Sequence, residues 1–258
     1  MKRIVIKCGG SVMDQLSPAF FESLHHLQKN GYQLIFVHGG GPEINKMLQI
    51  HKVESQFING LRKTTPETMK IVEMVLSGVA NRKLATLLDS NGFEAVGLNG
   101  SDHGFLQADF INEAELGLVG EIIKVKAELL EVILNKGYIP VVTPIATTED
   151  GKKLNINADF AAASVAKAIE AEMCIFVTDV EGVLINKQLV EHLDTEEIKQ
   201  HIDSGEISGG MIPKVNSAVA VLEQGLASVM IASGKHNFFN GEAWTGTKMT
   251  KKQVEVVQ

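Results

Sequence analysis

Six short apolar runs are spaced along the chain, and each ends in glycine or polar residues and is followed by a helical pattern. They cover residues 4–6, 34–37, 95–98, 139–142, 174–177 and 229–231. Uninterrupted apolar runs of this length suit strands buried on both faces, because a solvated face would need polar residues at alternate positions. Their alternation with helices predicts an α/β fold, a three-layer αβα sandwich with a central, mainly parallel sheet.

The first two predicted helices open with the same signal. In Ser17-Pro18 and again in Thr65-Pro66, an N-cap residue precedes a proline at the first helical position. These helices are expected to end at Gly31 and at residue 77. Two further helices are predicted over residues 160–171, capped by Asn157 or Asp159, and over residues 196–204, capped by Thr195. Hairpins are predicted over residues 57–63, 118–126 and 146–154.

Length and composition predict a single domain built from two closely joined lobes. A chain of 258 residues with 45% hydrophobic residues can bury a large core. No linker rich in proline, glycine or serine divides it, so we expect one domain over residues 1–258. We place the lobe boundary near Glu172, where the alanine-rich helix ends, which gives an N-lobe of residues 1–172 and a C-lobe of residues 173–258.

Charge, cysteine usage and hydropathy narrow the class of protein. The formal net charge is −7, from 24 Lys and Arg against 31 Asp and Glu, and no basic run stands out, so nucleic acid is not an expected partner. Cys8 and Cys174 lie outside any CxxC pattern and are expected to be reduced and mostly buried. No apolar segment reaches the roughly 20 residues of a membrane span. The N-terminal apolar run is too short for a signal peptide, so we expect a soluble cytoplasmic protein without membrane contact.

Two glycine-rich turns follow the first two apolar runs. Lys7-Cys8-Gly9-Gly10 ends the first run, and His38-Gly39-Gly40-Gly41 ends the second. Glycines at a strand-to-helix turn let backbone N–H groups approach a ligand, and the helix N-terminus adds partial positive charge. A lone Gly-Gly pair is more often a plain tight turn, but three consecutive glycines and a second copy favour two anion sites at one edge of the sheet.

Charged and polar residues near these turns extend the candidate site. Lys7 can neutralise a phosphate, and Arg62 can clamp a carboxylate in two-point fashion, although each taken alone is as easily a solvated side chain. Asn155 and Asp159 flank a predicted helix start, where capping alone would explain one of them. A second rim with glycines and a lysine covers residues 178–183 and 208–214.

Motifs of other enzyme classes do not occur in the chain. It contains no G-x-x-x-x-G-K-[ST], no G-x-G-x-x-G, no G-x-S-x-G and no H-E-x-x-H. A phosphate-binding enzyme built on these turns would therefore work without a Walker P-loop.

Six of these motifs, in this order and spread over essentially the whole chain, resemble the acetylglutamate kinase family of the amino-acid kinase superfamily. They are Lys7-Cys8-Gly9-Gly10, His38-Gly39-Gly40-Gly41, Asn59-Gly60-Leu61-Arg62, Asn155-Ile156-Asn157-Ala158-Asp159, Thr178-Asp179-Val180-Glu181-Gly182-Val183 and Gly210-Met211-Ile212-Pro213-Lys214. The resemblance implies the amino-acid kinase fold. It implies ATP-dependent phosphorylation of the γ-carboxylate of N-acetyl-L-glutamate to N-acetyl-L-glutamyl 5-phosphate, the second step of arginine biosynthesis.

The resemblance also implies roles for individual residues. Lysines at the positions of Lys7 and Lys214 would stabilise the transferring phosphoryl group, and Asp159 would orient both. The N-lobe would bind the acid and form a homodimer, and the C-lobe would bind ATP with its Mg²⁺. Assigned to the acid are Gly40, Gly41, Arg62 and Asn155. Assigned to ATP are Gly9 and Gly10 at the β- and γ-phosphates, together with Thr178, Asp179, Val180, Glu181, Gly182, Val183, Ser208, Gly209, Gly210 and Met211.

The chemistry of such a reaction fits this set of residues. A γ-carboxylate is already ionised at neutral pH, so the nucleophile needs no general base. The remaining task is to align two anions and to neutralise charge on the phosphoryl oxygens. Asp159 is therefore expected to organise the lysines, with no role in proton transfer, and no protein-held metal is expected.

Some readings remain open from the sequence. The first strand begins by Arg3, without the extra N-terminal helix of hexameric, arginine-inhibited relatives, so a homodimer without arginine feedback is expected. Pro213 stands where an aliphatic residue is usual and is tolerable only in a first helical turn. The alternatives are an N-acetylaminoadipate kinase, whose substrate is one methylene longer, and a non-catalytic sensor of ATP or an acylamino acid.

Overall fold

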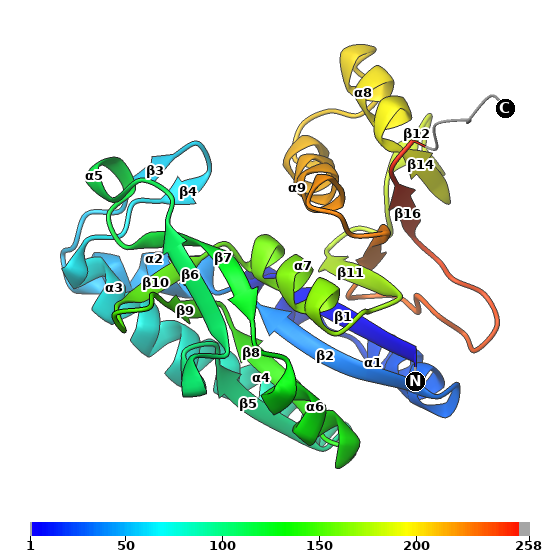
Figure 1. Cartoon of the computed structure of the whole chain (residues 1–258). Coiled ribbons are helices and arrows are strands. Elements are labelled where there is room, and N and C mark those ends of the chain that lie inside the picture. Colours follow the sequence, from blue (N-terminus) through cyan, green and yellow to red (C-terminus); the bar gives the residue numbers. More distant parts are fainter. Residues whose placement is uncertain (1, 253–258) are drawn as a thin grey trace, which may run out of the picture.

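The structure is a computed structural model of the chain, and it describes residues 2–252 (Figure 1). Its centre is one eight-stranded sheet in which only the pair β15–β16 is antiparallel. In spatial order the strands are β14 (His192–Asp194), β16 (Thr247–Thr250), β15 (Ser228–Ser233), β11 (Met173–Thr178), β1 (Lys2–Cys8), β2 (Tyr32–His38), β8 (Ile139–Thr143) and β5 (Ala95–Asn99). All six predicted apolar runs form strands of this sheet.

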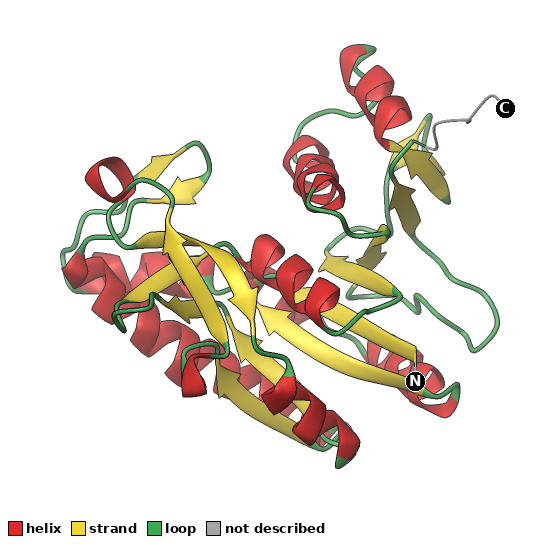
Figure 2. Ribbon diagram, viewed as in Figure 1, coloured by secondary structure: helices red, strands yellow, loops and turns green. Residues whose placement is uncertain are grey.

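Helices cover both faces of the sheet, which confirms the three-layer sandwich (Figure 2). On one face lie α6 (Glu128–Asn135), α7 (Ala158–Ala168) and α9 (Met211–Glu223), and on the other lie α1 (Pro18–Lys29) and α4 (Asn81–Ser90). Successive residues of β1 alternate between the two cores, because side chains of a strand point to opposite faces. Val5 packs on the α7 side, whereas Ile4 and Ile6 pack on the α1 side. The same alternation places Lys7 on the face covered by α7.

The long helical segment after Thr65 differs from its prediction. Thr65 caps α3 (Pro66–Glu73) as expected. The helix does not end at residue 77 but passes through a π-helical segment, η2 (Met74–Ala80), directly into α4. Ser77-Gly78 therefore loosens the winding without stopping the helix, and side chains beyond it pack into the core.

Two other predictions of local structure are wrong. Residues 118–126 form one strand, β7 (Val119–Val125), instead of a hairpin, because its partners are distant segments. The cap of α8 (Thr195–Asp203) is Asp194 rather than Thr195, and Glu197 completes a capping box with it. The caps Ser17 and Asn157 are confirmed.

A small closed barrel of β10, β7, β6 and β9 lies beside the sandwich. Its other strands are β6 (Leu106–Phe110), β9 (Ile145–Thr147) and β10 (Lys153–Ile156), and the β9–β10 pair confirms the predicted hairpin over residues 146–154. The hairpin predicted over residues 57–63 is also present. The remaining elements are η1 (Gly10–Gln15), α2 (Gly41–Ile50), β3 (Phe57–Ile58), β4 (Leu61–Arg62), η3 (Asp102–Gly104), α5 (Glu113–Leu116), β12 (Leu184–Ile185) and β13 (Gln188–Leu189).

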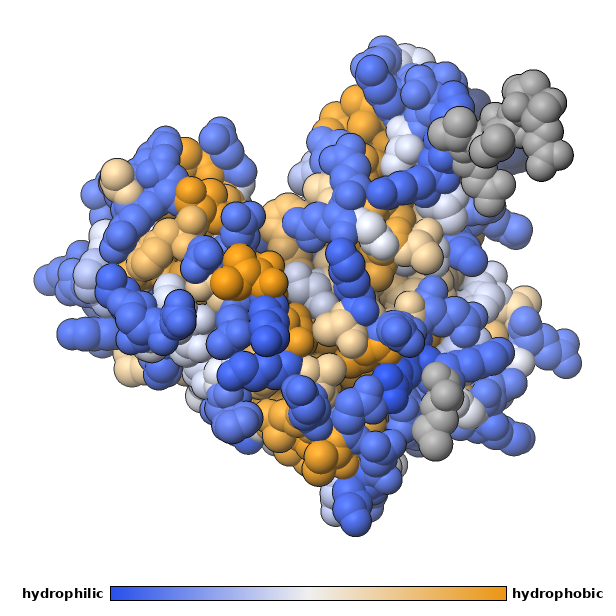
Figure 3. Space-filling model, viewed as in Figure 1, coloured by the Kyte–Doolittle hydropathy of each residue, from blue (hydrophilic) through white to orange (hydrophobic). Residues whose placement is uncertain are grey.

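A hollow separates the barrel from the C-terminal helices (Figure 3). It is a cleft of about 620 Å³ that lies between β7, α7 and the end of α9. The central sheet continues beneath it, because β1 and β11 pair over five residues from Ile4↔Met173 to Cys8↔Val177. No helix within residues 2–252 combines the length and apolarity needed to cross a bilayer.

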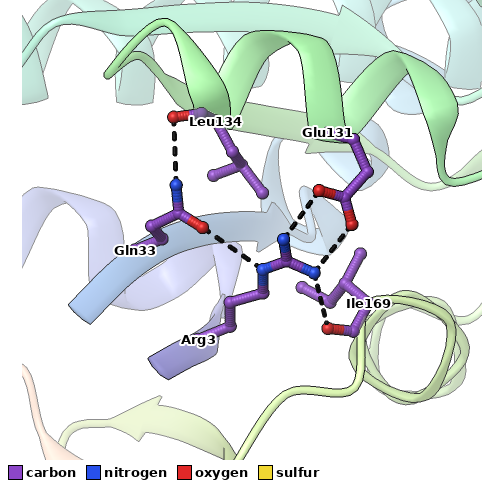
Figure 4. Close-up of polar contacts among 5 residues, drawn as sticks. All are labelled: Arg3, Gln33, Glu131, Leu134 and Ile169. Atoms are coloured by element: carbon purple, nitrogen blue, oxygen red, sulfur yellow. Dashed lines mark hydrogen bonds and ion pairs between the residues drawn. The ribbon is translucent and has the colours of Figure 1, made fainter. Parts of the chain in front are cut away.

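An arginine at the start of β1 ties four elements together (Figure 4). The two Nη atoms of Arg3 lie 2.7 and 2.6 Å from the two carboxylate oxygens of Glu131 on α6. Arg3 also donates to the side chain of Gln33 on β2 and to the carbonyl of Ile169 at the end of α7. This two-point ion pair lies at the edge of the sheet where β1 begins, opposite the edge where its glycine turn lies.

Candidate active site

Three of the predicted catalytic residues line one cavity of about 200 Å³. Lys7 is the second-last residue of β1, Asp159 lies in the first turn of α7, and Lys214 lies in the first turn of α9. The full lining is Lys7, Asp159, Phe176, Thr178, Pro213, Lys214, Ser217 and Ile231. Pro213 lies within the first turn of α9, the position in which a proline is tolerated.

Lys7 and Asp159 form the most enclosed ion pair of the cavity. Nζ of Lys7 lies 2.8 Å from Oδ1 of Asp159, and the side chains are 19% and 17% exposed. Asn157 accepts hydrogen bonds from the N–H groups of Asp159 and Phe160, which fixes the start of α7 and hence the carboxylate. Oδ1 is buried and receives no other donor, so Lys7 alone compensates its charge.

Lys214 has a different carboxylate partner in this structure. Its Nζ lies 2.7 Å from Oδ1 of Asp179, in the loop that follows β11. The hydrogen bond from Lys214 holds the pKa of the Asp179 carboxyl below its usual value. Each lysine of the cavity is thus paired with its own aspartate, and the common orienting role expected for Asp159 remains a prediction.

The two glycine-rich turns follow neighbouring strands and touch each other. Cys8 pairs with His38, and the N–H of Gly39 donates to the carbonyl of Cys8 at 3.0 Å. A Cβ atom on Gly10 would lie 2.9 Å from Cα of Gly40, which is closer than a side chain can approach a backbone. Glycine is therefore required where the turns meet, and both turns lie at the same edge of the sheet, as predicted.

Arg62 reaches the second glycine turn from the hairpin β3–β4. Its guanidinium donates to Oγ of Ser55 at 2.6 Å and to the carbonyl of Gly41 at 3.5 Å, and it lies 4.6 Å from the ring centroid of Phe57. Arg62 is only 7% exposed, and burial lowers the pKa of its guanidinium. The structure thus brings Arg62 and the turn of Gly40 and Gly41 together.

A buried threonine joins Arg62 to Asn155. Nδ2 of Asn155 donates to Oγ1 of Thr64 at 3.1 Å, and that hydroxyl donates to the carbonyl of Arg62 at 2.7 Å. Thr64 is fully buried and does not form part of any motif that the sequence singled out. Its position two residues after Arg62 in the sequence was the available signal.

The end of β11 and the loop after it contain one residue that lines the cavity and others that pack on β16. Thr178 lines the cavity, and its hydroxyl accepts from the N–H of Val180 at 3.3 Å. Gly182 and Val183 instead meet Thr247: a Cβ on Gly182 would lie 2.6 Å from its Oγ1, and the N–H of Val183 donates to it at 2.8 Å. Both residues therefore have a packing role whatever else they do.

The other predicted segments lie around the same rim. Oε1 of Glu181 lies 3.6 Å from Nε2 of His236. Ser208, Gly209 and Gly210 form the turn before α9, with Gly209 at φ +56°, and Met211 packs partly on the core. Within residues 2–252, no three His, Cys, Asp or Glu side chains come together in a way that could hold a metal ion.

Comparison with known proteins assigns this arrangement to a family. The family model described as "Amino acid kinase family" matches residues 2–233. The chain belongs to the amino acid kinase family. Its closely similar relatives carry the name acetylglutamate kinase. One, from Geobacillus stearothermophilus, is 49% identical over 251 residues, which is 97% of each chain.

Solved structures agree with the amino acid kinase fold. The structure of smu.665 from Streptococcus mutans UA159 is 33% identical with a TM-score of 0.82, and the match covers 96% of this chain and 98% of that one. Carbamate kinase from Giardia lamblia has a TM-score of 0.65 at 16% identity, covering 97% and 99% of the two chains. The second likeness concerns the fold alone.

Proposed function

We propose that this amino acid kinase transfers the γ-phosphoryl group of ATP to the γ-carboxylate of N-acetyl-L-glutamate, giving N-acetyl-L-glutamyl 5-phosphate in arginine biosynthesis. The observation that carries the proposal is the cavity in which Lys7, Asp159 and Lys214 converge. The relatives named acetylglutamate kinase, which match the chain almost end to end, support the choice of acid.

The charges around the cavity suit the approach of two anions. Lys7 and Lys214 would stabilise the three equatorial oxygens of the transferring phosphoryl group, where charge spreads during transfer. Lys214 would exchange its hydrogen bond with the exposed Asp179 for the phosphate. Mg²⁺ that arrives with ATP would neutralise the remaining phosphate charge.

The glycine turns and Arg62 would hold the two substrates in line. The turn of Gly9 and Gly10 would take the β- and γ-phosphates, and the turn of Gly40 and Gly41 would take the acid. Because the turns touch, both substrates can be held within reach of Lys7. Arg62 and Asn155, joined through Thr64, would bind the carboxylate and amide of the acid.

The lobes would share these tasks. We propose that residues 1–172 bind the acid and form a homodimer, that residues 173–258 bind ATP, and that the enzyme works in the cytoplasm. The exposed apolar side chains Met74 and Val79, which are 53% and 51% exposed on the π-helical segment, offer a dimer surface. Light scattering that gives the mass of a monomer or a hexamer would contradict the dimer.

The deciding experiment is ADP release with N-acetylglutamate, N-acetylaminoadipate and glutamate as acceptors. We expect the highest kcat/KM with N-acetylglutamate. One extra methylene is worth only about 1 to 3 kcal/mol of discrimination, so the longer acid should react measurably but about tenfold or more slowly. A Lys7→Ala protein purified in parallel controls for contaminating kinases. Binding of ATP and acid without turnover of either acylated acid would favour a sensor and refute the proposal.

A further inference from the structure

A fully buried histidine lies directly before the glycine turn proposed to bind the acid. His38 ends β2 and is 0% exposed. Its Nδ1 lies 3.1 Å from the carbonyl oxygen of Gly39, and its Nε2 lies 3.2 Å both from Nδ2 of Asn81 and from Oγ1 of Thr143. These contacts join the ends of β2 and β8 to the first residue of α4.

The partners fix the direction of every hydrogen bond in this network. A carbonyl only accepts, so Nδ1 of His38 carries the proton that reaches Gly39. The amide nitrogen of Asn81 has two N–H groups and cannot accept a hydrogen bond, so its contact with Nε2 is a donation to the ring. One N–H donates to the carbonyl of Val141 at 2.7 Å, and the other is shared between Nε2 of His38 and the carbonyl of Leu98 at 3.4 Å. His38 is therefore the neutral Nδ1–H tautomer, and burial lowers the pKa of its imidazole to about 4.

The position of Asn81 is itself held from its far side. Nη2 of Arg82 donates to Oδ1 of Asn81. A Cβ atom on Gly97 of β5 would lie 2.1 Å from that oxygen, so the strand leaves room for the amide only because residue 97 is glycine. The amide of Asn81 is thus enclosed on both sides and cannot rotate without breaking buried hydrogen bonds.

The consequence for the glycine turn follows from the planarity of the peptide bond. The carbonyl of Gly39 and the N–H of Gly40 belong to one trans peptide unit, so they point in opposite directions. Holding the carbonyl against the buried ring of His38 makes the N–H of Gly40 point away from the core. Gly40 precedes α2, and no group within residues 2–252 accepts a hydrogen bond from its N–H, so this donor is suited to an anion.

We propose that His38 and Asn81 are positioning residues for the acceptor acid, which they serve by fixing the Gly39–Gly40 peptide so that the N–H of Gly40 is presented to the bound carboxylate. This inference rests on the proposed function, because it assumes that the turn of Gly40 binds the acid. Neither side chain touches substrate. They act only through the direction of one backbone donor.

The test compares KM for N-acetylglutamate with KM for ATP in three variants, Asn81→Ala, His38→Gln and Thr143→Val. We expect Asn81→Ala and His38→Gln to raise KM for N-acetylglutamate by about tenfold to a hundredfold, the range for loss of a hydrogen bond to a charged group. KM for ATP should change less than about twofold. Thr143→Val removes only the second contact of Nε2 and should raise KM for the acid a few-fold. It also keeps the test available if the other variants do not fold.

Ser23→Ala is the matched control. Ser23 is also 0% exposed, and its hydroxyl accepts from the N–H groups of Phe238 and Phe239 at 3.0 and 3.2 Å, outside the cavity. We expect it to lower the melting temperature and to leave both Michaelis constants unchanged. Nitrogen NMR of ¹⁵N-labelled histidine should show the Nδ1–H tautomer of His38 in the wild type, and a mixture of tautomers in Asn81→Ala.

The outcomes separate this inference from the function on which it rests. If wild type does not turn over N-acetylglutamate, the proposed function fails and takes the inference with it. If wild type is active but the Asn81 and His38 variants behave like Ser23→Ala, the network only stabilises the fold and the inference alone is wrong. Equal increases in both Michaelis constants would overturn it as well.

Discussion

The buried histidine also makes the stability of the protein depend on pH. Burial of His38 lowers the pKa of its imidazole from 6.5 to about 4, and the charge of nearby Arg82 acts in the same direction. The unfolded chain binds a proton at this histidine below about pH 6.5, whereas the folded chain does so only below about pH 4. His38 therefore opposes folding increasingly as the pH falls through this window, and its contribution is neutral above it.

The size of the effect follows from the size of the shift. At about 1.4 kcal/mol per pKa unit, the shift of the His38 pKa lowers the free energy of unfolding by about 3 kcal/mol once the pH has fallen below both pKa values. About 2 kcal/mol of it should be lost between about pH 7 and about pH 5. That loss is a large fraction of the total stability of a typical domain.

Equilibrium urea unfolding of wild type and His38→Gln at several pH values measures this contribution. The variant is expected to be less stable than wild type near pH 7, because glutamine cannot reproduce the buried network. The difference should shrink by about 2 kcal/mol on going to about pH 5, since only wild type must keep an imidazole uncharged. His51→Gln, at an exposed histidine, is the control for replacing a histidine outside the buried network. Parallel curves for wild type and His38→Gln would refute the reasoning.

Three further predictions follow from the site and from the ion pair of Figure 4. Lys7→Ala should lower kcat by about a hundredfold or more, because the charge on the transferring phosphoryl group is no longer stabilised by this cation. Arg62→Ala should mainly raise KM for the acid. Steady-state kinetics showing the reverse pattern would mean that the roles of the two residues are exchanged. Arg3→Ala should lower the free energy of unfolding by about 2 kcal/mol, because a two-point ion pair is lost. It should leave kcat and KM unchanged, since the length of β1 places Arg3 about 20 Å from the glycine turn at the other end of the strand. Altered kinetics in the folded variant would contradict this. Gly10→Ala should lower the free energy of unfolding by about 1 to 3 kcal/mol, because its Cβ would meet backbone at 2.9 Å. A Cβ on Gly41 would meet nothing within 4 Å, so the free energy of unfolding of Gly41→Ala in urea should lie within about 0.5 kcal/mol of wild type. Equal losses in the two variants would show that the crowding at Gly10 is not real.

Much of the fold could be predicted because local sequence patterns determine it. Strands buried on both faces need consecutive apolar residues, and caps such as Ser17 act within one turn of their helix. The hairpin predicted over residues 118–126 is wrong because β7 is defined by pairing with β6 and β10, which the segment itself does not encode. The π-helical continuation through Ser77-Gly78 depends likewise on packing, which overrides the weak local preference against helix.

In the candidate site, too, some features could be predicted from local sequence patterns and others could not. Lys7 and the glycine turns could be found because strand ends of a parallel sheet share an edge. The pairing of Lys214 with Asp179 depends on how α9 docks on the sheet, which no motif specifies. His38 was visible in the sequence only as part of a glycine motif. Its partner Asn81 follows 43 residues later and carries no signal of its own.

The π-helical segment η2 has a consequence for how this chain can tolerate insertions and deletions. A π-helix holds more residues per turn than an α-helix, so the segment contains more residues than an α-helical segment with the same number of turns would. Removing one residue from Met74–Ala80 would let the backbone wind tightly without interrupting the helix. The tighter α-helical winding would make up for the lost residue, so the residues after the deletion would keep about the same orientation and Asn81 would stay near His38. The chain should therefore tolerate the loss of one residue here better than in α3 or α4, where every residue beyond a deletion would rotate by about 100° about the helix axis.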